Sequence, residues 1–368
     1  MTRVLVTGQN GYIGSVLAPM LQDAGHEVVG LDSDYFDACR FGLASEATPR
    51  IEAYRRDMRD LQPADVPVCD AVMHLAALSN DALGTLDPAI TDAVNHRASV
   101  RLAEMARAAG ASRFIFSSSC SLYGAAEGDE LLTEEASFNP VTPYGRSKVD
   151  AEAGIRGLAT DDFSPVYLRN ATAYGPSPRL RGDLVVNELV ARAHLDGRVQ
   201  LNSDGMAWRP LVHVEDIARA FIAALEAPRE VVHNEAFNVG ASRENYTVRE
   251  IAEMVCDAVP DSTVTFGEGA GADKRSYRVS FDKIAEALPA ARPQWTLRQG
   301  IQQLLQAYRT HGITLAEILQ TRYSRIAWLR AQQEAGRLDE ALRWLPDAEA
   351  PRASGAGTPA ATAAGEVR

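Results

Sequence analysis

Three closely spaced glycines separate the first two predicted elements of the chain. The apolar run at residues 3–7 is typical of a buried strand, and the sequence TGQNGYIG leads from it into an amphipathic helix near Ile13. Gly8 permits a tight turn, Gly11 lets the backbone approach a diphosphate at the helix N-terminus, and Gly14 allows close packing of the helix. The spacing therefore predicts a dinucleotide-binding βαβ unit and restricts the fold to the α/β class.

The first half of the chain repeats this alternation of strand and helix. Strands are predicted at residues 3–7, 27–31, 51–55, 71–75, 113–117 and 165–169. Two helix starts are marked by a capping side chain before a proline, at Asp87-Pro88 and Thr142-Pro143. Strands that alternate with helices form parallel sheets. We therefore expect a Rossmann-type, doubly wound parallel sheet with a smaller, interleaved C-terminal lobe that binds substrate.

The order of elements also predicts a division into domains. Residues 1–175 are expected to form the nucleotide-binding domain, to which residues 210–240 return with a helix and a strand. Residues 176–209 and 241–345 are expected to form the substrate-binding lobe, with a charged helical extension from about residue 315. Residues 346–368 contain few large apolar side chains and are predicted to be disordered.

Composition excludes several classes of partner. A net charge of -12 argues against sequence-independent binding of nucleic acid. The four cysteines form no CxxC pair, so neither a metal site nor a disulfide scaffold is predicted. No leader-like segment or membrane-length apolar stretch is visible, and we expect a cytoplasmic protein with no membrane partner. The helical extension could pack on the lobe or support a homodimer, and a homodimer is expected.

Asp32 follows the second predicted strand and indicates which dinucleotide is bound. It lies 18 residues after Gly14, where a carboxylate can bond the adenosine ribose and would repel a 2′-phosphate. Asp34 is near enough to compete for this role. The position favours NAD over NADP as cofactor.

Tyr144 and Lys148 are four residues apart at the start of a capped helix, so their side chains share one face. An ammonium near a phenol, reinforced by the positive nicotinamide, stabilises phenolate, and we expect the two charges to lower the pKa of Tyr144 from about 10 toward the working range. Tyr144 could then exchange a hydroxyl proton while hydride moves to or from NAD. The serines at 117–119, at a strand end, strengthen this interpretation.

These motifs together resemble the short-chain dehydrogenase/reductase superfamily, whose fingerprint is TGxxGxxG rather than GxGxxG. The resemblance extends over about residues 1–310 and includes HLAA after the fourth strand and YxxxK in the helix. It implies the cofactor-binding residues Gly8, Asn10, Gly11, Tyr12, Ile13, Gly14, Asp32, Asp57, Met58, Leu75, Ala76, Ala77, Tyr144 and Lys148. It implies Ser119, Tyr144, Lys148 and Asn95 as the catalytic residues.

The second half is similar to the nucleotide-sugar epimerase and dehydratase branch, including UDP-glucose 4-epimerases. This resemblance implies a nucleotide-diphosphate sugar as substrate, bound by Ser121, Asn170, Thr172, Asn187, Arg209 and Arg275. His213 is interpreted as a packed residue that closes the Arg209 motif. The chain departs from the branch at Ala270, where an arginine is usual, which leaves the details of nucleotide anchoring open.

Two residues beside Ser119 bear on the reaction. The branch's 4,6-dehydratases carry an Asp-Glu pair after the catalytic hydroxyl, whereas this chain has Cys120 and Ser121. We therefore expect an epimerase that oxidises the sugar transiently to a keto-sugar and returns hydride to the other face. An NAD(P)-dependent keto-sugar reductase or a dehydratase of the same family remains an alternative, and a non-catalytic dinucleotide-binding protein is a third.

Overall fold

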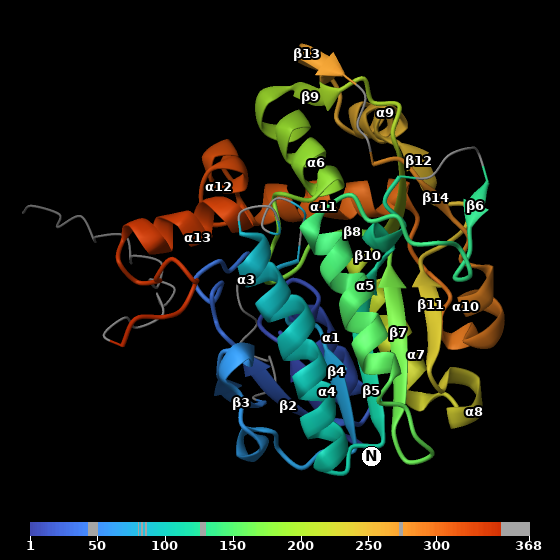
Figure 1. The fold of residues 1–368 in the computed structure, drawn as a ribbon. Helices are drawn as coiled ribbons and strands as arrows, with labels where there is room; N and C mark the ends of the chain where they lie inside the picture. Colours follow the sequence, from blue (N-terminus) through green and yellow to red (C-terminus); the bar gives the residue numbers. More distant parts are fainter. Residues whose placement is uncertain are drawn as a thin grey trace, which may run out of the picture.

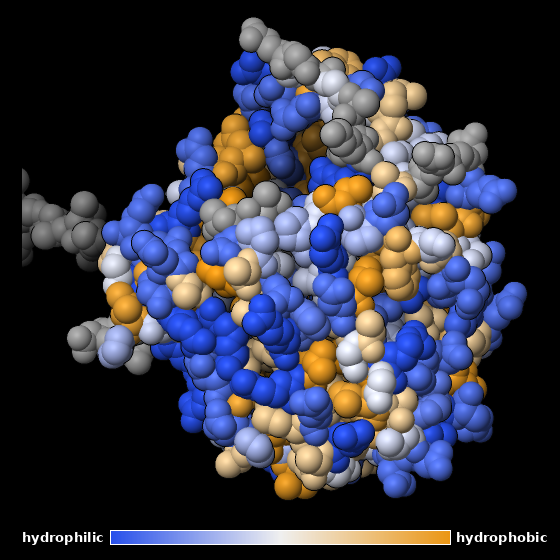
Figure 2. Space-filling view, viewed as in Figure 1, coloured by the Kyte–Doolittle hydropathy of each residue, from blue (hydrophilic) through white to orange (hydrophobic). Residues whose placement is uncertain are grey.

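The computed structural model describes residues 1–42, 51–79, 81, 84, 87–125, 130–271 and 275–346. The segment predicted to be disordered lies outside the described residues except for Pro346, and so do the three residues that precede Arg275. No helix among the described residues is long and apolar enough to cross a membrane. On the face shown in Figure 2, hydrophilic residues predominate and apolar ones are scattered between them.

A parallel sheet forms the centre of the molecule (Figure 1), with strand order β11-β7-β5-β4-β1-β2-β3. Its strands are β1 (Arg3–Thr7), β2 (Glu27–Asp32), β3 (Glu52–Arg55), β4 (Ala71–His74), β5 (Arg113–Ser119), β7 (Ser164–Asn170) and β11 (Glu235–Val239). All six predicted strands are present within one or two residues, and the predicted Rossmann-type fold is confirmed. The strand predicted at 113–117 continues to Ser119, so all three serines lie within it.

Helices cover both faces of this sheet, as a parallel sheet requires. One face packs against α1 (Gly14–Asp23) and α7 (Val214–Glu226), and the other against α4 (Ala98–Ala108) and α5 (Pro143–Arg156). Successive residues of β1 point to opposite faces: Val4 and Val6 belong to the first core, and Leu5 to the second. The sheet is therefore apolar on both sides, and polar side chains gather where its strands end.

Local capping chemistry fixes several helix starts. Asp87 accepts hydrogen bonds from the backbone at the start of α3 (Pro88–Asp92), which runs into a π-helical turn, η3 (Ala93–Arg97). The Thr142 hydroxyl accepts one from Gly145 N at the start of α5. These predicted caps are confirmed, and the cap of α5 fixes the position of Tyr144 in its first turn.

A second, smaller core lies above the carboxyl ends of the sheet. It is formed mainly by α6 (Val185–Asp196), α9 (Val248–Ala258) and α11 (Leu297–His311), with β9 (Arg198–Ser203) paired to β13 (Thr263–Gly271). A short sheet of β8 (Thr172–Tyr174), β10 (Trp208–His213) and β12 (Asn245–Thr247) connects it to the main body. The remaining described elements are η1 (Met58–Asp60), η2 (Pro63–Asp65), η4 (Cys120–Tyr123), β6 (Leu131–Leu132), α8 (Arg229–Val232), β14 (Arg278–Val279), α10 (Asp282–Ala287) and η5 (Pro289–Ala291).

The C-terminal extension, defined here as residues 315–346, differs from the prediction of a helix over 315–345. It contains two helices, α12 (Leu315–Leu319) and α13 (Arg325–Glu334), and the prediction is wrong for the residues after Glu334. Gly336 has φ +65° just after α13, a conformation that glycine adopts readily at a helix C-terminus. The chain then folds back through a bridge between Leu338 and Trp344.

Candidate active site

A cavity of about 580 Å³ lies at the carboxyl ends of the central strands and extends into the second core. Its lining includes residues that follow β1, β2, β4 and β5, together with residues of α5, β9 and β10. In open α/β sheets, ligands bind in the crevice where the strand order reverses, which here is between β1 and β4. The cavity therefore occupies the position expected of a dinucleotide and substrate site.

The glycine turn lines one wall of the cavity. Gly8 has φ +75°, and a Cβ there would lie 2.8 Å from Ala76 N. A Cβ on Gly14 would lie 2.1 Å from Gly8 O, so this glycine lets the helix pack against the turn itself. Tyr12 and Ile13 also line the cavity, whereas Asn10 does not. These glycines therefore let the turn pack closely against the loop after β4 and against the start of α1, where a helix N-terminus can face a diphosphate.

Asp32 ends β2 and faces this cavity. It accepts hydrogen bonds from Asn10 N (3.0 Å) and Asp34 N (2.8 Å). Burial, and then the neighbouring Asp34, raise the pKa of Asp32 to about 6. The Asn10 amide donates a hydrogen bond to the Asp34 carboxylate (2.7 Å), which holds this loop. Asn10 was predicted to bind the cofactor, but its side chain does not line the cavity. Of the two candidate aspartates, only Asp32 lines the cavity.

The far end of the same wall is formed by Asp57 and Met58, both of which line the cavity as predicted. Asp57 caps η1, and its carboxylate accepts hydrogen bonds from the backbone N–H and the guanidinium of Arg59. These bonds lower the pKa of Asp57 although burial opposes them.

Leu75, Ala76 and Ala77 also line the cavity, and two buried polar contacts hold their loop. Asn95 is fully buried in η3, where its amide accepts from Leu78 N (2.8 Å) and donates to Leu78 O (3.0 Å). Asn95 does not line the cavity. Asn95 therefore holds the loop after β4 through Leu78, and the structure does not bring it to the cavity with the other residues implied to be catalytic.

His74 fixes the other side of this loop, and the sequence interpretation gave it no part of its own. Its ring lies 2.6 Å from Thr7 Oγ1 and 2.8 Å from Ser99 Oγ. Burial lowers the pKa of His74 to about 3, so the ring is neutral at physiological pH. Thr7 and Ser99 lie far from the HLAA motif along the chain, so no sequence spacing indicated this network.

The predicted catalytic groups converge at the centre of the cavity. Ser119, Tyr144 and Lys148 all line it, the first from the end of β5 and the others from the first turns of α5. The Lys148 ammonium donates to Ser117 O (2.7 Å) and lies 5.8 Å from the centroid of the Tyr144 ring. The helical spacing thus delivers the proximity that the sequence predicted.

The expected lowering of the Tyr144 pKa includes the charge of bound NAD and stays a prediction. In the protein alone, burial raises the pKa of Tyr144 to about 12, while a hydrogen bond with Ser119 and the charge of Arg181 oppose the rise. Burial also lowers the pKa of Lys148 to about 7. The sequence argument counted the attraction between ammonium and phenolate but omitted the cost of removing both charges from water, which is larger here.

Ser119 is held by its neighbour. Its hydroxyl lies 2.9 Å from Ser121 Oγ, and its oxygen accepts from Ser121 N (3.1 Å). Cys120 points into the core instead, where its thiol donates to Arg169 O and burial raises its pKa. Of the two residues that follow Ser119, only Ser121 lines the cavity, and its side chain is a small neutral hydroxyl.

Polar residues from the second half complete the cavity. Asn170, Thr172, Arg209 and Arg275 all line it, as predicted. Asn170 donates to Ser117 Oγ (3.0 Å), while its own amide oxygen is buried with no hydrogen-bond partner among the described residues. Two guanidiniums at this end make a site that suits phosphate oxygens.

Asn187 was predicted to bind substrate, but the structure does not bring its side chain to the cavity. It is fully buried within α6, accepts from Gly175 N (3.0 Å) and donates to Arg181 O (2.9 Å). Its amide is thus used to fix the segment between β8 and α6. The motif placed Asn187 near the site, but the helix turns its side chain into the core.

Asp81 and Tyr277 are among the cavity residues that the sequence interpretation missed. The Asp81 carboxylate accepts hydrogen bonds from the Arg275 guanidinium (2.8 Å) and the Thr142 hydroxyl (2.7 Å). These bonds link the loop after β4 to the end of the cavity that contains Arg275. Tyr277 is buried and shares a hydrogen bond with Ser121. Neither belongs to a motif, so no spacing could have indicated them.

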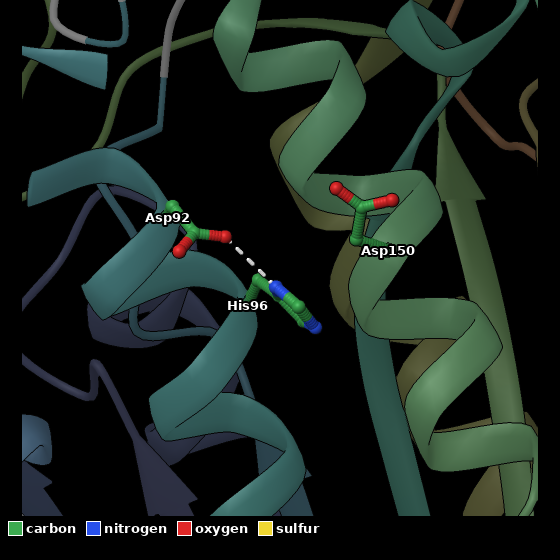
Figure 3. Close-up of side chains that lie close together, drawn as sticks. All are labelled: Asp92, His96 and Asp150. Atoms are coloured by element: carbon green, nitrogen blue, oxygen red, sulfur yellow. Dashed lines mark hydrogen bonds and ion pairs between the residues drawn. The ribbon is translucent and has the colours of Figure 1, made fainter. Parts of the chain in front are cut away.

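One trio of potential metal ligands occurs among the described residues, formed by Asp92, His96 and Asp150 (Figure 3). These side chains come from the outer parts of α3, η3 and α5, and none lines the cavity. Asp92 is already paired with His96 (2.8 Å) and Arg97. The trio is explained by these contacts and is not assigned a metal.

Comparisons with known proteins agree with this geometry. Residues 4–240 match the model of the NAD dependent epimerase/dehydratase family. A UDP-glucose 4-epimerase of Mycolicibacterium smegmatis is 31% identical over 83% of this chain and 98% of its own length. UDP-glucuronic acid decarboxylase 1 of Arabidopsis thaliana is 28% identical over 83% of this chain and 70% of its own. The structure of MoeE5 with UDP-glucuronic acid and NAD superposes with a TM-score of 0.72 at 28% identity, covering 84% and 99% of the two chains.

The fold and the site define an NAD-dependent enzyme of the extended short-chain dehydrogenase/reductase type. The chain belongs to the NAD-dependent epimerase/dehydratase family. Its cofactor is NAD, and the residues present fit it: Gly8, Gly11 and Gly14 line the cavity at the start of α1, and Asp32 offers an acceptor at the end of β2. The relatives include an epimerase and a decarboxylase, so membership of the family does not distinguish between reactions.

Proposed function

We propose that this protein is an NAD-dependent epimerase of a nucleotide-diphosphate sugar. The observation that carries the proposal is the pairing of Ser119 with Ser121 in a cavity that also contains Tyr144 and Lys148. Ser121 supplies a small neutral hydroxyl at the place where dehydratases of the family carry acidic groups. The cavity therefore has the groups for moving a hydroxyl proton but lacks, at this position, an acid or base for eliminating water.

Each residue has a defined task in this proposal. NAD, when bound, accepts a hydride from one sugar carbon and returns it to the same carbon. Tyr144 holds the proton of the reacting sugar hydroxyl on its phenol oxygen, and Ser119 donates a hydrogen bond to the same sugar oxygen. Lys148 contributes positive charge beneath Tyr144, from a position fixed by its bond to Ser117 O. Ser121 orients Ser119.

The substrate end of the cavity supports a nucleotide-diphosphate sugar. Arg209 and Arg275 line it, and both guanidiniums are anchored by the protein, Arg209 to Trp208 O (2.7 Å) and Arg275 to Asp81 (2.8 Å). Anchored guanidiniums bind a diphosphate with less loss of side-chain freedom than mobile ones. Inversion further requires the keto-sugar to rotate, and a diphosphate held at one end permits that rotation of the sugar.

The second candidate is net reduction of a keto-sugar with exchangeable cofactor, because the same residues can move the same proton. Incubation with UDP-glucose and related nucleotide sugars, followed by NMR analysis of the products, separates the two. The epimerase proposal predicts a product of unchanged composition with one inverted centre and no consumption of added NADH. Stoichiometric loss of NADH, or release of water or CO2, would contradict it.

A further inference from the structure

The C-terminal extension lies beyond the region that matches the family model, yet it returns to the nucleotide-binding half. The indole N–H of Trp328 donates to Tyr35 O (2.7 Å), and that of Trp344 donates to Ser33 O (2.7 Å). Both acceptors belong to the loop directly after Asp32. The extension is therefore bonded to the loop that carries the cofactor-selecting aspartate.

Apolar and charged contacts make this attachment extensive. Leu329, Leu338 and Leu342 of the extension form one buried cluster with Tyr35. Arg59, which also holds Asp57, donates to Ala341 O (2.6 Å). The extension is thus part of the folded structure around the adenosine end of the cavity, rather than an appended tail.

Arg325, the first residue of α13, brings a cation from this extension to the cavity wall. The side chain is only 2% exposed, and Arg325 and Ile326 both line the cavity. The guanidinium packs 3.9 Å from the centroid of the Phe36 ring and donates through Nη2 to Arg179 O (2.9 Å). Its Nη1 is buried with no hydrogen-bond partner among the described residues.

The charge balance around Arg325 is incomplete. Two nearby guanidiniums have carboxylate partners: Arg179 pairs with Asp37 (2.7 Å) and Arg181 with Asp183 (3.0 Å). Arg325 forms no ion pair with a carboxylate in the described part of the chain, and burial lowers its pKa to about 10 although the charge of Asp183, which is paired with Arg181, opposes this shift. A buried cation without a counter-charge destabilises the folded state unless an anion joins it. The wall of the cavity at this point is suited to an anionic group.

We propose that Arg325 is a further cofactor-binding residue, whose guanidinium pairs with the diphosphate of NAD, so that the C-terminal extension forms one wall of the cofactor site. The diphosphate is the anionic part of NAD, and a guanidinium matches its oxygens in shape and charge. Release of NAD then leaves a buried cation unpaired, which slows dissociation. The proposal concerns cofactor retention and holds for any reaction of this family.

The test uses the full chain stripped of nucleotide, with NAD affinity measured by calorimetry and NAD release by fluorescence. Arg325→Met keeps the packing of the stem and removes the charge, Arg325→Lys keeps the charge, and Arg330→Met alters an exposed arginine of the same helix as control. We expect Arg325→Met to weaken NAD binding about tenfold or more and to speed its release, since hydrogen bonds to charged groups are strong. Arg325→Lys should be intermediate and Arg330→Met unchanged.

UDP binding in the same variants shows whether any loss is local. UDP carries a diphosphate but lacks the adenosine and nicotinamide parts, and the proposal predicts that its affinity does not change. An NAD affinity of Arg325→Met within about twofold of wild type would overturn the assignment. An equal weakening of UDP and NAD would also overturn it, since it would indicate general damage to the fold.

Discussion

The ammonium of Lys148 lies 5.8 Å from the centre of the Tyr144 ring, and both side chains are almost completely buried. Burial disfavours the charged form of each group, so the pKa of Tyr144 is raised to about 12 and that of Lys148 is lowered to about 7. The phenol is therefore protonated and the lysine partly neutral in the structure described here. Four predictions follow from this relationship and from the groups around it.

Replacement of Tyr144 by phenylalanine removes the group that holds the sugar proton and leaves the ring packing in place. We expect turnover of the preferred nucleotide sugar to fall about a hundredfold or more, the usual contribution of a positioned acid or base. NAD affinity should change little. Tyr54→Phe is a matched control, because Tyr54 is exposed on β3. Equal turnover by Tyr144→Phe and wild type would remove Tyr144 from the mechanism.

Lys148 should make the stability of the protein depend on pH. Because the pKa of Lys148 is about 7 in the folded protein and 10.5 in the unfolded chain, the unfolded chain binds more protons between these limits. The free energy of unfolding should therefore rise with pH across this window, by on the order of a few kcal/mol at most. Chemical denaturation of wild type and Lys148→Met at several pH values measures this. The rise should be reduced in the variant, and parallel curves would show that Lys148 is not the titrating group.

Asp32 should decide between the two dinucleotides. Its carboxylate repels a 2′-phosphate, so Asp32→Ala should weaken NAD and improve the relative binding of NADP by about tenfold or more. Because burial and Asp34 raise the pKa of Asp32 to about 6, the preference of wild type for NAD should also diminish as the pH falls through that value. Asp34→Ala serves as the comparison, since Asp34 does not line the cavity. Titration of both dinucleotides against each variant checks the prediction, which fails if Asp34→Ala has the larger effect.

Arg209 should contribute to substrate binding and not to cofactor binding. Arg209→Met removes a guanidinium from the substrate end of the cavity, and we expect KM for the nucleotide sugar to rise about tenfold. NAD affinity should stay unchanged. The control is Arg198→Met, which alters an exposed arginine at the start of β9 and should change neither KM for the nucleotide sugar nor NAD affinity. An unchanged KM would indicate that the diphosphate lies elsewhere.

Much of the fold could be predicted because the relevant signals are local. The spacing of Gly8, Gly11 and Gly14, the caps at Asp87 and Thr142, and the apolar runs of the strands each depend on neighbours in the sequence. The order of the strands then follows from the known behaviour of βαβ units. For the same reason the convergence of Ser119, Tyr144 and Lys148 was predictable.

The errors and omissions concern properties set by distant residues. The motif around Asn187 gave its approximate position, but the packing of α6 decides that its amide faces Gly175 and Arg181. The pKa of Tyr144 depends on burial, which no spacing reveals. Arg325 is far from every motif along the chain, and only the folding back of the extension brings it to the cavity.

The central claim is that hydride leaves one sugar carbon and returns to the same carbon within a single active site. The most direct measurement uses the nucleotide sugar that the protein turns over, carrying deuterium at the carbon that is inverted, incubated with the purified protein and no added cofactor. We predict a nucleotide sugar of the same mass, inverted at that carbon, with deuterium retained there. Loss of deuterium to solvent, or a product lighter by water or CO2, would contradict this mechanism.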